Sequence, residues 1–467
     1  MWFSRNLSIK GKVTVLKSVA LPKLQYIASH MPIQTDIYKK TNNIISKFIW
    51  NCKRPKVNKH VIIQPIEEGG IKAPDFESIV KANRVSWIKR LAQPNEAKWK
   101  AILVDLIKPI SLSHFIETNL SDDDVSAIPI PFYREMFKAW NEVKKQPSHA
   151  SQYKNEILWH NKFIKTPIGP KSKKSETIIS QKLYQAGITR LNDLLNNHGE
   201  PMTHVDFIHS YHINFNVLSY YKLVRAIPKE WFQCIKVNNK QVILTNTSHT
   251  YSIENGSDSD LHLLKASTKQ IYNVFVKRKA VPPSSLEKWE IDIGIDFGNE
   301  WKTIFKLPYH CTRSTQLQAL QYRILHRYLP CKQWLHKIGI SDTNLCDNCQ
   351  VIDTIEHYLF SCELVSDLWS QIESWWNNIS DCEIVLTKKH VIIGIYYDLN
   401  HFSSINYVIL LAKMYIYCQK MNKSNVSFNT FLLIVKNQLN IEGNICENNN
   451  TIVAFNKKWK TVIESFI

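Results

Sequence analysis

Glycine is scarce in this chain, at 12 of 467 residues, well below half of the usual ~7%. Tight hairpin turns and many loops depend on glycine, so its scarcity argues against a β-rich fold. Hydrophobic residues make up 44% of the chain, enough to fill large cores. We therefore predict a mainly α, multi-domain helical assembly. Apolar alternation around Asn238 and Asn239 predicts one small β-hairpin, near residues 233–245.

Catalytic motifs are also missing from the sequence. It contains no P-loop, no G-x-S-x-G and no H-E-x-x-H. Ser121 and the three aspartates after it lack the preceding apolar strand of a two-metal site, and they fit the N-terminus of a helix better. Asp292 and Asp296 lie in a stretch that favours a capped loop. We predict no catalytic residue and no small-molecule substrate.

Membrane and export signals are absent as well. The first twelve residues, MWFSRNLSIKGK, have no apolar core of a signal peptide. The longest apolar stretch, residues 407–418, contains Lys413 and is too short to span a bilayer. The ten cysteines do not form the pattern of a disulfide framework. These features predict a cytoplasmic or nuclear protein without a membrane partner.

Positive charge is abundant. The chain has 59 lysines and arginines and 40 acidic residues, which gives a net charge of +19. Such a surplus favours a polyanionic partner. Near the N-terminus, Lys10, Lys12 and Lys17 lie in an expected helix. A second helix, expected over residues 315–329, carries Arg323 and Arg327 four residues apart. We take these five side chains as candidate nucleic-acid contacts; solvated faces or structural salt bridges are the alternative.

The most informative motif is C-x2-C-x7-H-x4-C, formed by Cys346, Cys349, His357 and Cys362. Three thiolates and one imidazole can complete a tetrahedral zinc shell. Four protein ligands leave no open position, so the predicted zinc is structural. Zinc knuckles commonly contact single-stranded nucleic acid. Buried or redox-active thiols are the alternative, and the other seven cysteines show no ligand spacing and are expected to be small buried hydrophobes.

Several separated segments of the chain together carry a family likeness. These segments are residues 5–26, 48–57, 67–76, 157–164, 186–195, 220–231, 346–369, 410–420 and 454–460. In order and spacing they resemble the C-terminal part of the reverse transcriptase of LINE-type (non-LTR) retrotransposons. The N-terminal segments resemble the thumb, the middle segments resemble the connector beyond it, and the Cys-His cluster and tail resemble the end of such proteins.

The resemblance implies a thumb-like region at 1–95, a connector at 96–285 and a C-terminal zinc-knuckle domain at 286–467. It implies binding of RNA and RNA–DNA hybrid during target-primed reverse transcription. The family's endonuclease and palm segments have no counterpart here, so we expect a nucleic-acid-binding fragment without polymerase residues. The alternative is a zinc-stabilised protein-interaction module from a degenerate or domesticated element.

Overall fold

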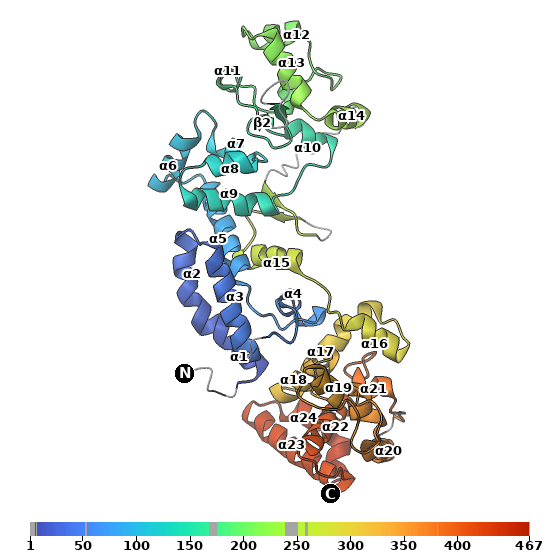
Figure 1. The fold of residues 1–467 in the computed structure, drawn as a ribbon. Coiled ribbons are helices and arrows are strands. Elements are labelled where there is room, and N and C mark those ends of the chain that lie inside the picture. Colours follow the sequence, from blue (N-terminus) through green and yellow to red (C-terminus); the bar gives the residue numbers. More distant parts are fainter. Residues whose placement is uncertain are drawn as a thin grey trace. The chain divides into compact units, whose positions relative to one another are not determined.

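The computed structural model describes residues 5, 7–51, 54–167, 175–238, 251–256, 260–380 and 382–466. Helices account for most of these residues and the strands are short (Figure 1), which confirms the predicted mainly α fold. The packing divides the chain into two compact units. Unit 1 comprises residues 1–19, 42–74 and 280–467, and unit 2 comprises residues 20–41 and 75–279. The functional regions expected from the sequence follow other boundaries and stay a prediction.

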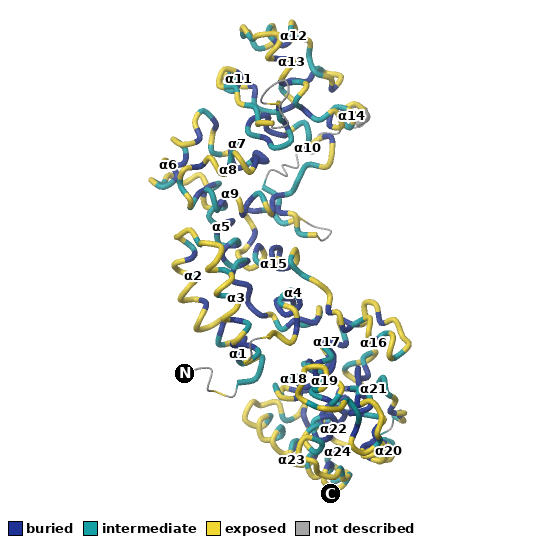
Figure 2. Tube along the Cα trace, viewed as in Figure 1, coloured by how far each residue is buried: buried dark blue, intermediate teal, exposed yellow. Residues whose placement is uncertain are grey.

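Helix α22 (Ser403–Met421) is the central helix of unit 1. Its side chains are buried on all sides between Ile405 and Ile416, as expected for a helix enclosed by its neighbours. Figure 2 shows this buried path beside α23 (Phe428–Asn448), which is exposed along much of its length. The other helices in this part are α16 (Leu286–Ile293), α17 (Trp301–Cys311), α18 (Thr315–Leu325), α19 (Lys332–Lys337), α20 (Glu363–Ile379), α21 (Lys388–Ile392) and α24 (Ile452–Glu464).

The N-terminal segment contributes α1 (Ile9–Val15) to unit 1. Ser8 caps helix α1, because its hydroxyl accepts a hydrogen bond from the backbone N–H of Gly11 at 3.2 Å. It lies against α18, which follows some three hundred residues later in the chain. Unit 1 also holds the end of α3 (Thr35–Trp50), the short α4 (Lys59–Ile62) and the 3-10 turn η2 (Ile66–Glu68).

A glycine pair closes the turn after η2. Gly69 has φ +79°, a conformation that side chains disfavour. At Gly70 a Cβ atom would lie only 2.0 Å from the carbonyl oxygen of Gln64. The carbonyl oxygen of Gly69 also lies 2.8 Å from Nε2 of His326, so this turn is fixed to the end of α18.

Unit 2 is built around α5 (Phe76–Leu91), which packs against α9 (Pro131–Val143) and α15 (Thr268–Lys279). Asp75 caps α5 by accepting a hydrogen bond from the N–H of Ser78 at 3.1 Å. The remaining helical elements of this unit are α2 (Leu21–His30), α6 (Lys98–Ile107), α7 (Leu112–Glu117), α8 (Asp122–Ala127), α10 (Ala150–Asn155), α11 (Gln181–Gln185), η3 (Leu191–Leu194), α12 (His204–Tyr211), α13 (Val217–Ala226) and α14 (Lys229–Asn238).

The strands form two small antiparallel pairs, β1 (Lys165–Pro167) with β2 (Ser175–Thr177) and β3 (Ser252–Ile253) with β4 (Leu261–His262). The hairpin predicted near 233–245 is wrong over 233–238, which belong to α14. Residues 239–245 lie outside the described part. The helix forms because Trp231 and Ile235, four residues apart, bury on one side of it.

Across the described residues, no helix combines the length and apolarity needed to cross a membrane. Helix α22 has 19 residues and a largely apolar centre, but it carries Lys413 among its buried residues. The ammonium of Lys413 donates to Oε1 of Gln321 at 2.5 Å and to the carbonyl oxygen of Val391 at 2.8 Å. The buried nitrogen of Lys413 is thus hydrogen-bonded inside the helical core of unit 1.

Candidate metal centre

Cys346, Cys349, His357 and Cys362 come together in unit 1. One potential ligand atom from each residue lies within 4.8 Å of all the others. Sγ of Cys362 is 3.9 Å from Sγ of Cys346 and 3.7 Å from Sγ of Cys349. Two thiolates bound at ~2.3 Å to one tetrahedral ion lie about 3.8 Å apart. The spacing is therefore that of ligands to a shared ion, and it is far too long for disulfide bonds.

A tight loop presents the first two cysteines. The N–H of Cys346 donates to the carbonyl oxygen of Val351 at 2.8 Å, and the N–H of Gln350 donates back to that of Cys346 at 3.1 Å. Gln350 has φ +55°, which turns the chain sharply after Cys349. The two-residue gap thus places both thiols on one side of the loop, as predicted from the sequence.

The last two ligands lie at either end of one π-helical turn, η6 (His357–Ser361). Thr354 Oγ1 accepts a hydrogen bond from the N–H of His357 at 3.0 Å and fixes the start of this turn. The N–H of Cys362 donates to the carbonyl oxygen of His357, also at 3.0 Å. Cys362 is in addition the N-cap residue of α20, so its sulfur lies at a helix N-terminus, where thiolate charge is stabilised.

His357 provides an independent test of whether an ion fits here. Its side chain is buried, and Nε2 has no hydrogen-bond partner among the described residues. Leaving such a buried nitrogen unsatisfied is costly, about 1–3 kcal/mol. A metal ion among the three sulfurs would satisfy it, because neutral imidazole nitrogen is a common zinc ligand. The residues present therefore fit a bound ion.

The metal-free thiols differ in acidity. Burial raises the pKa of the Cys362 thiol to about 11, and it outweighs the opposite effect of the Leu364 backbone N–H at the start of α20. Burial also acts to raise the pKa of Cys349, but hydrogen bonds from the Glu363 backbone and the Asn348 side chain outweigh it and hold that pKa below its usual value. Zinc binds thiolates, so occupation of the site must release protons.

Zinc is the ion that this donor set selects, since soft sulfur with imidazole suits zinc and four ligands complete its tetrahedron. No position remains for an activated water. The centre is thus structural, as expected from the spacing. The nearby buried carboxylate of Asp353 is engaged elsewhere, because its Oδ2 accepts the N–H of Lys332 at the start of α19, at 2.8 Å.

The structure separates the two predicted arginines. The helix expected over 315–329 ends at Leu325, because Arg327 adopts φ +57° just after it. The prediction that Arg323 and Arg327 share one face of a helix is therefore wrong. The guanidinium of Arg327 lies 2.6 Å from the carboxylate of Asp292 and stacks 4.3 Å from the ring centre of Trp289. These contacts give Arg327 a structural partner on α16.

The remaining predicted cations fall into two neighbouring hollows of unit 1. Lys12 and Arg323 line a hollow of about 640 Å³, hereafter the large hollow. The ammonium of Lys12 is buried and donates to the carbonyl oxygen of Ile49 and to Oδ1 of Asn51. Lys10 and Lys17 are exposed and line a smaller hollow of about 190 Å³.

The carboxylates considered for catalysis have structural roles. Ser121 caps α8, and its hydroxyl accepts the N–H of Asp124 at 3.1 Å. Asp124 in turn accepts hydrogen bonds from His160 and Thr177. Asp296 accepts the N–H of Gly298 at 2.9 Å in a tight loop. The Ser121 stretch is therefore a helix cap, as predicted. Asp292 instead lies in the last turn of α16, so the capped loop expected there is wrong.

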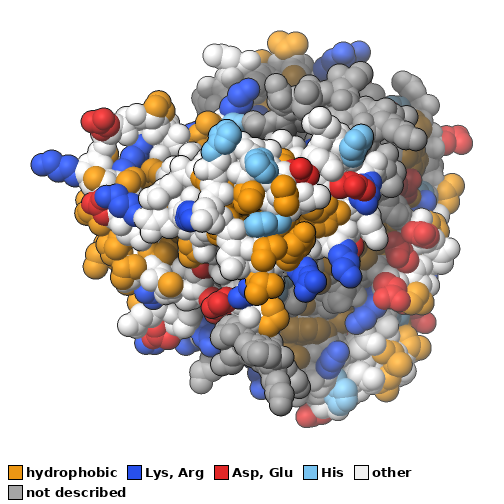
Figure 3. All heavy atoms as spheres, turned by 90° about the horizontal axis from the view of Figure 1, so that it is seen from above, with side chains coloured by type: hydrophobic (Ala, Val, Ile, Leu, Met, Phe, Trp, Pro, Cys, Tyr) orange, Lys and Arg blue, Asp and Glu red, His pale blue; other side chains and the backbone are white. Residues whose placement is uncertain are grey.

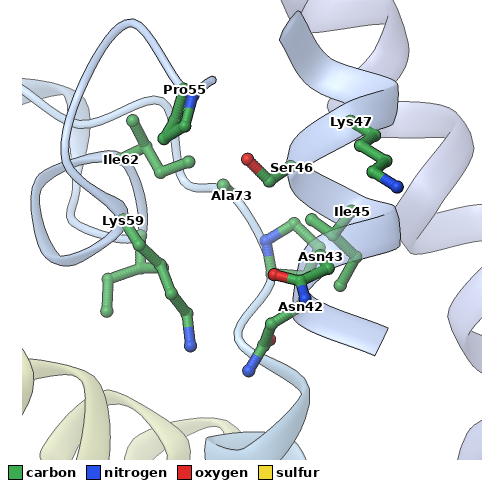
Figure 4. A pocket seen from close by; sticks show the side chains of 11 residues that line it. Asn42, Asn43, Ile45, Ser46, Lys47, Pro55, Lys59, Ile62 and Ala73 are labelled. Carbon is green, nitrogen blue, oxygen red and sulfur yellow. The ribbon is translucent and has the colours of Figure 1, made fainter. Parts of the chain in front are cut away.

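A third hollow, of about 360 Å³, lies between the end of α3 and the loop that carries α4 (Figure 4). Asn42 and Asn43 face it from α3, and Lys59 faces it from α4. Its described lining holds amides, lysines and aliphatic groups, without an acid–base pair.

The face shown in Figure 3 carries basic, acidic and histidine side chains interspersed with hydrophobic ones. Neither feature points to catalysis.

Sequence reasoning missed the aromatic lining of the large hollow. Trp334 lies in α19, between Arg323 and the first zinc ligand, and Tyr417 lies on α22. The ammonium of Lys56 lies over the ring of Trp334, 4.7 Å from its centre. A tryptophan close in sequence to both Arg323 and the zinc motif could have indicated this lining. The contact of Lys56 with Trp334 depends on the fold and could not be predicted.

Comparison with known families bears on the same region. Residues 267–369 match the sequence model of the family described as zinc-binding in reverse transcriptase. The matched range includes α18, α19 and all four zinc ligands. This part of the chain is thus a zinc-binding region of the type associated with retroelement reverse transcriptases.

Proposed function

We propose that this chain is the thumb, connector and zinc-knuckle region of a LINE-type reverse transcriptase, and that it binds single-stranded RNA and RNA–DNA hybrid. The observation that carries the proposal is the cluster of four potential zinc ligands, Cys346, Cys349, His357 and Cys362, inside the matched range 267–369. Zinc knuckles hold a short loop rigid beside single-stranded nucleic acid. The finer parentage comes from the resemblance of residues 5–76 to a thumb and of 157–231 to a connector.

The charge supports phosphate contact as the source of affinity. The net charge of +19 favours a polyanion. Lys10 and Lys17 are exposed on the first helical turns, and Arg323 lies half-buried on α18. Lys12 and Arg327 are bound to neighbouring groups in unit 1, so their role in this proposal is to hold the surrounding backbone.

The test is titration of labelled single-stranded RNA and of an RNA–DNA hybrid at several salt concentrations. Affinity should fall as salt rises, with a log–log slope of roughly −0.7 per phosphate neutralised on a single strand. Replacing Lys10 and Lys17 together by Ala should weaken binding and flatten the slope. The matched control is Lys457→Ala with Lys460→Ala, which removes the same charge from exposed positions of α24. Affinity that does not change with salt would refute the proposal.

A second candidate is a protein-interaction module. Several aliphatic side chains around the zinc loop are exposed, among them Ile340 at 70% and Val351 and Ile352 at 49% each. Exposed apolar side chains close together favour a protein partner. This function predicts binding that is insensitive to salt and is lost when Ile340 and Val351 are replaced by Ser, with RNA binding absent from the start.

A further inference from the structure

The large hollow lies wholly within unit 1. One face of α18 forms part of its lining, with Gln316, Ala319 and Arg323 at helical spacing. The rest comes from the start of α1, the end of α3 with the loop after it, the segment from Tyr328 to Trp334 of α19, and the central helix α22. Binding sites for small molecules typically measure about 300–1,000 Å³. A volume of about 640 Å³ is therefore sufficient for one nucleotide.

The chemistry of the lining is selective. Four aromatic side chains line it: Trp50, Tyr328, Trp334 and Tyr417. Its described lining also includes three cations and neither Asp nor Glu. Aromatic rings with cations and without carboxylates suit an anion that carries a flat apolar group. A nucleotide has both parts, since its base stacks on rings and its phosphate pairs with cations.

Two of the cations are placed to serve a ligand. Arg323 forms no ion pair with a carboxylate in the part of the chain that the structure describes. Lys56 is exposed, and its ammonium contacts the ring of Trp334. Lys12 is already held by backbone and amide oxygens, so it stabilises the wall.

Two of the aromatic side chains pack against each other. The rings of Trp50 and Tyr328 meet edge to face, with centres 5.8 Å apart. Tyr328 is also hydrogen-bonded to the side chain of Arg323. These contacts fix the aromatic rings beside the guanidinium.

The zinc centre supports two parts of this lining. Asp353, inside the zinc loop, binds the start of α19, which carries Trp334. Tyr358, next to His357, donates its hydroxyl to the carbonyl oxygen of Tyr417 at 3.5 Å. The metal loop therefore holds the positions of both Trp334 and Tyr417.

We propose that the large hollow receives one unpaired nucleotide of a bound single strand, with the base against Trp334 and Tyr417 and the phosphate beside Arg323 and Lys56. The inference rests on the proposed function, because it names the site in unit 1 that binds one nucleotide of the proposed single strand. Base stacking and phosphate pairing are common to RNA and DNA, so the experiment compares both sugars.

The test uses the full chain with labelled ten-nucleotide oligouridine and its deoxy counterpart, measured by fluorescence anisotropy. Trp334→Leu keeps an apolar side chain but removes the ring, and should weaken binding by on the order of tenfold. Its salt slope should stay unchanged, and Trp334→Phe should retain most of the affinity. Arg323→Ala should weaken binding and flatten the slope by about 0.7. Arg313→Ala, an exposed arginine outside the hollow, is the matched control.

A second measurement keeps the test independent of folding defects. Oligouridine that contains 5-iodouridine, irradiated in complex with the wild-type protein, should crosslink to peptides that contain Trp334 or Tyr417. Weaker binding of either sugar form to Trp334→Leu supports the hollow and identifies the sugar that it accepts. The opposite result is that the wild type binds RNA while Trp334→Leu and Arg323→Ala bind like Arg313→Ala and the crosslinks map elsewhere. In that case the assignment of the nucleotide to the hollow is wrong and the proposed function stands. If the wild type binds neither strand, both are wrong.

Discussion

The carboxylate of Asp353 accepts a hydrogen bond from the backbone N–H of Lys332 at 2.8 Å. This contact joins the zinc loop to the first turn of α19, twenty-one residues earlier in the chain. The carbonyl oxygen of Asp353 accepts a second bond, from the N–H of Gln333 at 3.2 Å. One buried residue between the second and third zinc ligands thus caps a neighbouring helix.

Replacing Asp353 by Ala should lower the free energy of unfolding by about 1 kcal/mol, because α19 loses its cap. Zinc content should remain unchanged, because none of the four ligands is altered. Asp347→Ala is the control, since that carboxylate pairs with the ammonium of Lys332 at an exposed position and should cost less. Denaturant unfolding with zinc analysis of each variant checks both statements, and equal losses for the two variants would contradict them.

Purified protein should contain about one zinc ion per chain. Cys349→Ser and His357→Ala should each lose the metal and unfold the 340–365 region, which depends on it. Cys418→Ser is the matched control, because this cysteine is exposed and lies outside the cluster. Inductively coupled plasma mass spectrometry and hydrogen exchange give the two readouts. Unchanged zinc in both ligand variants would show that the cluster binds no metal.

Arg327→Ala should cost about 1 kcal/mol of stability and leave nucleic-acid affinity unchanged. It forms a partly exposed ion pair with Asp292 and a cation–π contact with Trp289. Asp292→Asn should lower the melting temperature to a similar degree, since it weakens the same pair. A salt slope that flattens in Arg327→Ala without a loss of stability would assign this arginine to phosphate instead.

Lys413 should give unit 1 a distinct pH dependence. Burial lowers the pKa of its ammonium to about 7, while the unfolded chain titrates near its ordinary value of about 10.4. Between these values the unfolded state holds more protons, so stability rises with pH, by up to about 1.4 kcal/mol per unit from this group. Below pH 7 both states are protonated and the contribution is constant.

The comparison variant is Lys413→Met, which fills a similar volume without a charge. The difference in unfolding free energy between wild type and variant should increase in favour of wild type from pH 7 to pH 9.5. The slope carries the test, because the variant also leaves Oε1 of Gln321 without its partner. A difference that stays flat over this range would mean that Lys413 remains charged in the folded protein.

Removal of zinc should expose the thiols to oxidation. Sγ of Cys362 lies 3.7 Å from that of Cys349 and 3.9 Å from that of Cys346, so a small movement allows bonding. After chelation, diamide should take two hydrogen atoms from one pair and leave an internal disulfide, seen as a mass loss of about 2 Da. The zinc-loaded protein should resist, and crosslinking at equal rates with and without metal would contradict a shared ion.

The sequence was sufficient for the metal centre because all four ligands lie within one short stretch, where spacing alone limits the geometry. The helical fold was predictable for a similar reason, since composition and local periodicity act within single elements. The end of α18 was not predictable. Apolar periodicity continues through Tyr328, but the left-handed backbone at Arg327 ends the helix earlier.

Other failures arise from contacts between distant segments. The sequence predicts that Lys12 is an exposed lysine on a helix, yet its ammonium is buried against residues at the end of α3. Cys418 shows the opposite case: it was expected to be buried and is exposed on α22, whereas Cys311 and Cys331 are buried as predicted. Burial depends on which elements meet, and that information is not local.

The order of segments in unit 1 has a consequence for the synthesis of the chain. Its α1 and α4 leave the ribosome long before α18, because the roughly two hundred residues 75–279 of unit 2 come between them. At translation rates of ~5–20 residues per second, these early helices wait on the order of 10–40 s for their partners. Their apolar faces stay open during that interval, while unit 2 can complete its own core. A chaperone that acts on the nascent chain would find its binding sites in the early segments of unit 1, residues 1–19 and 42–74.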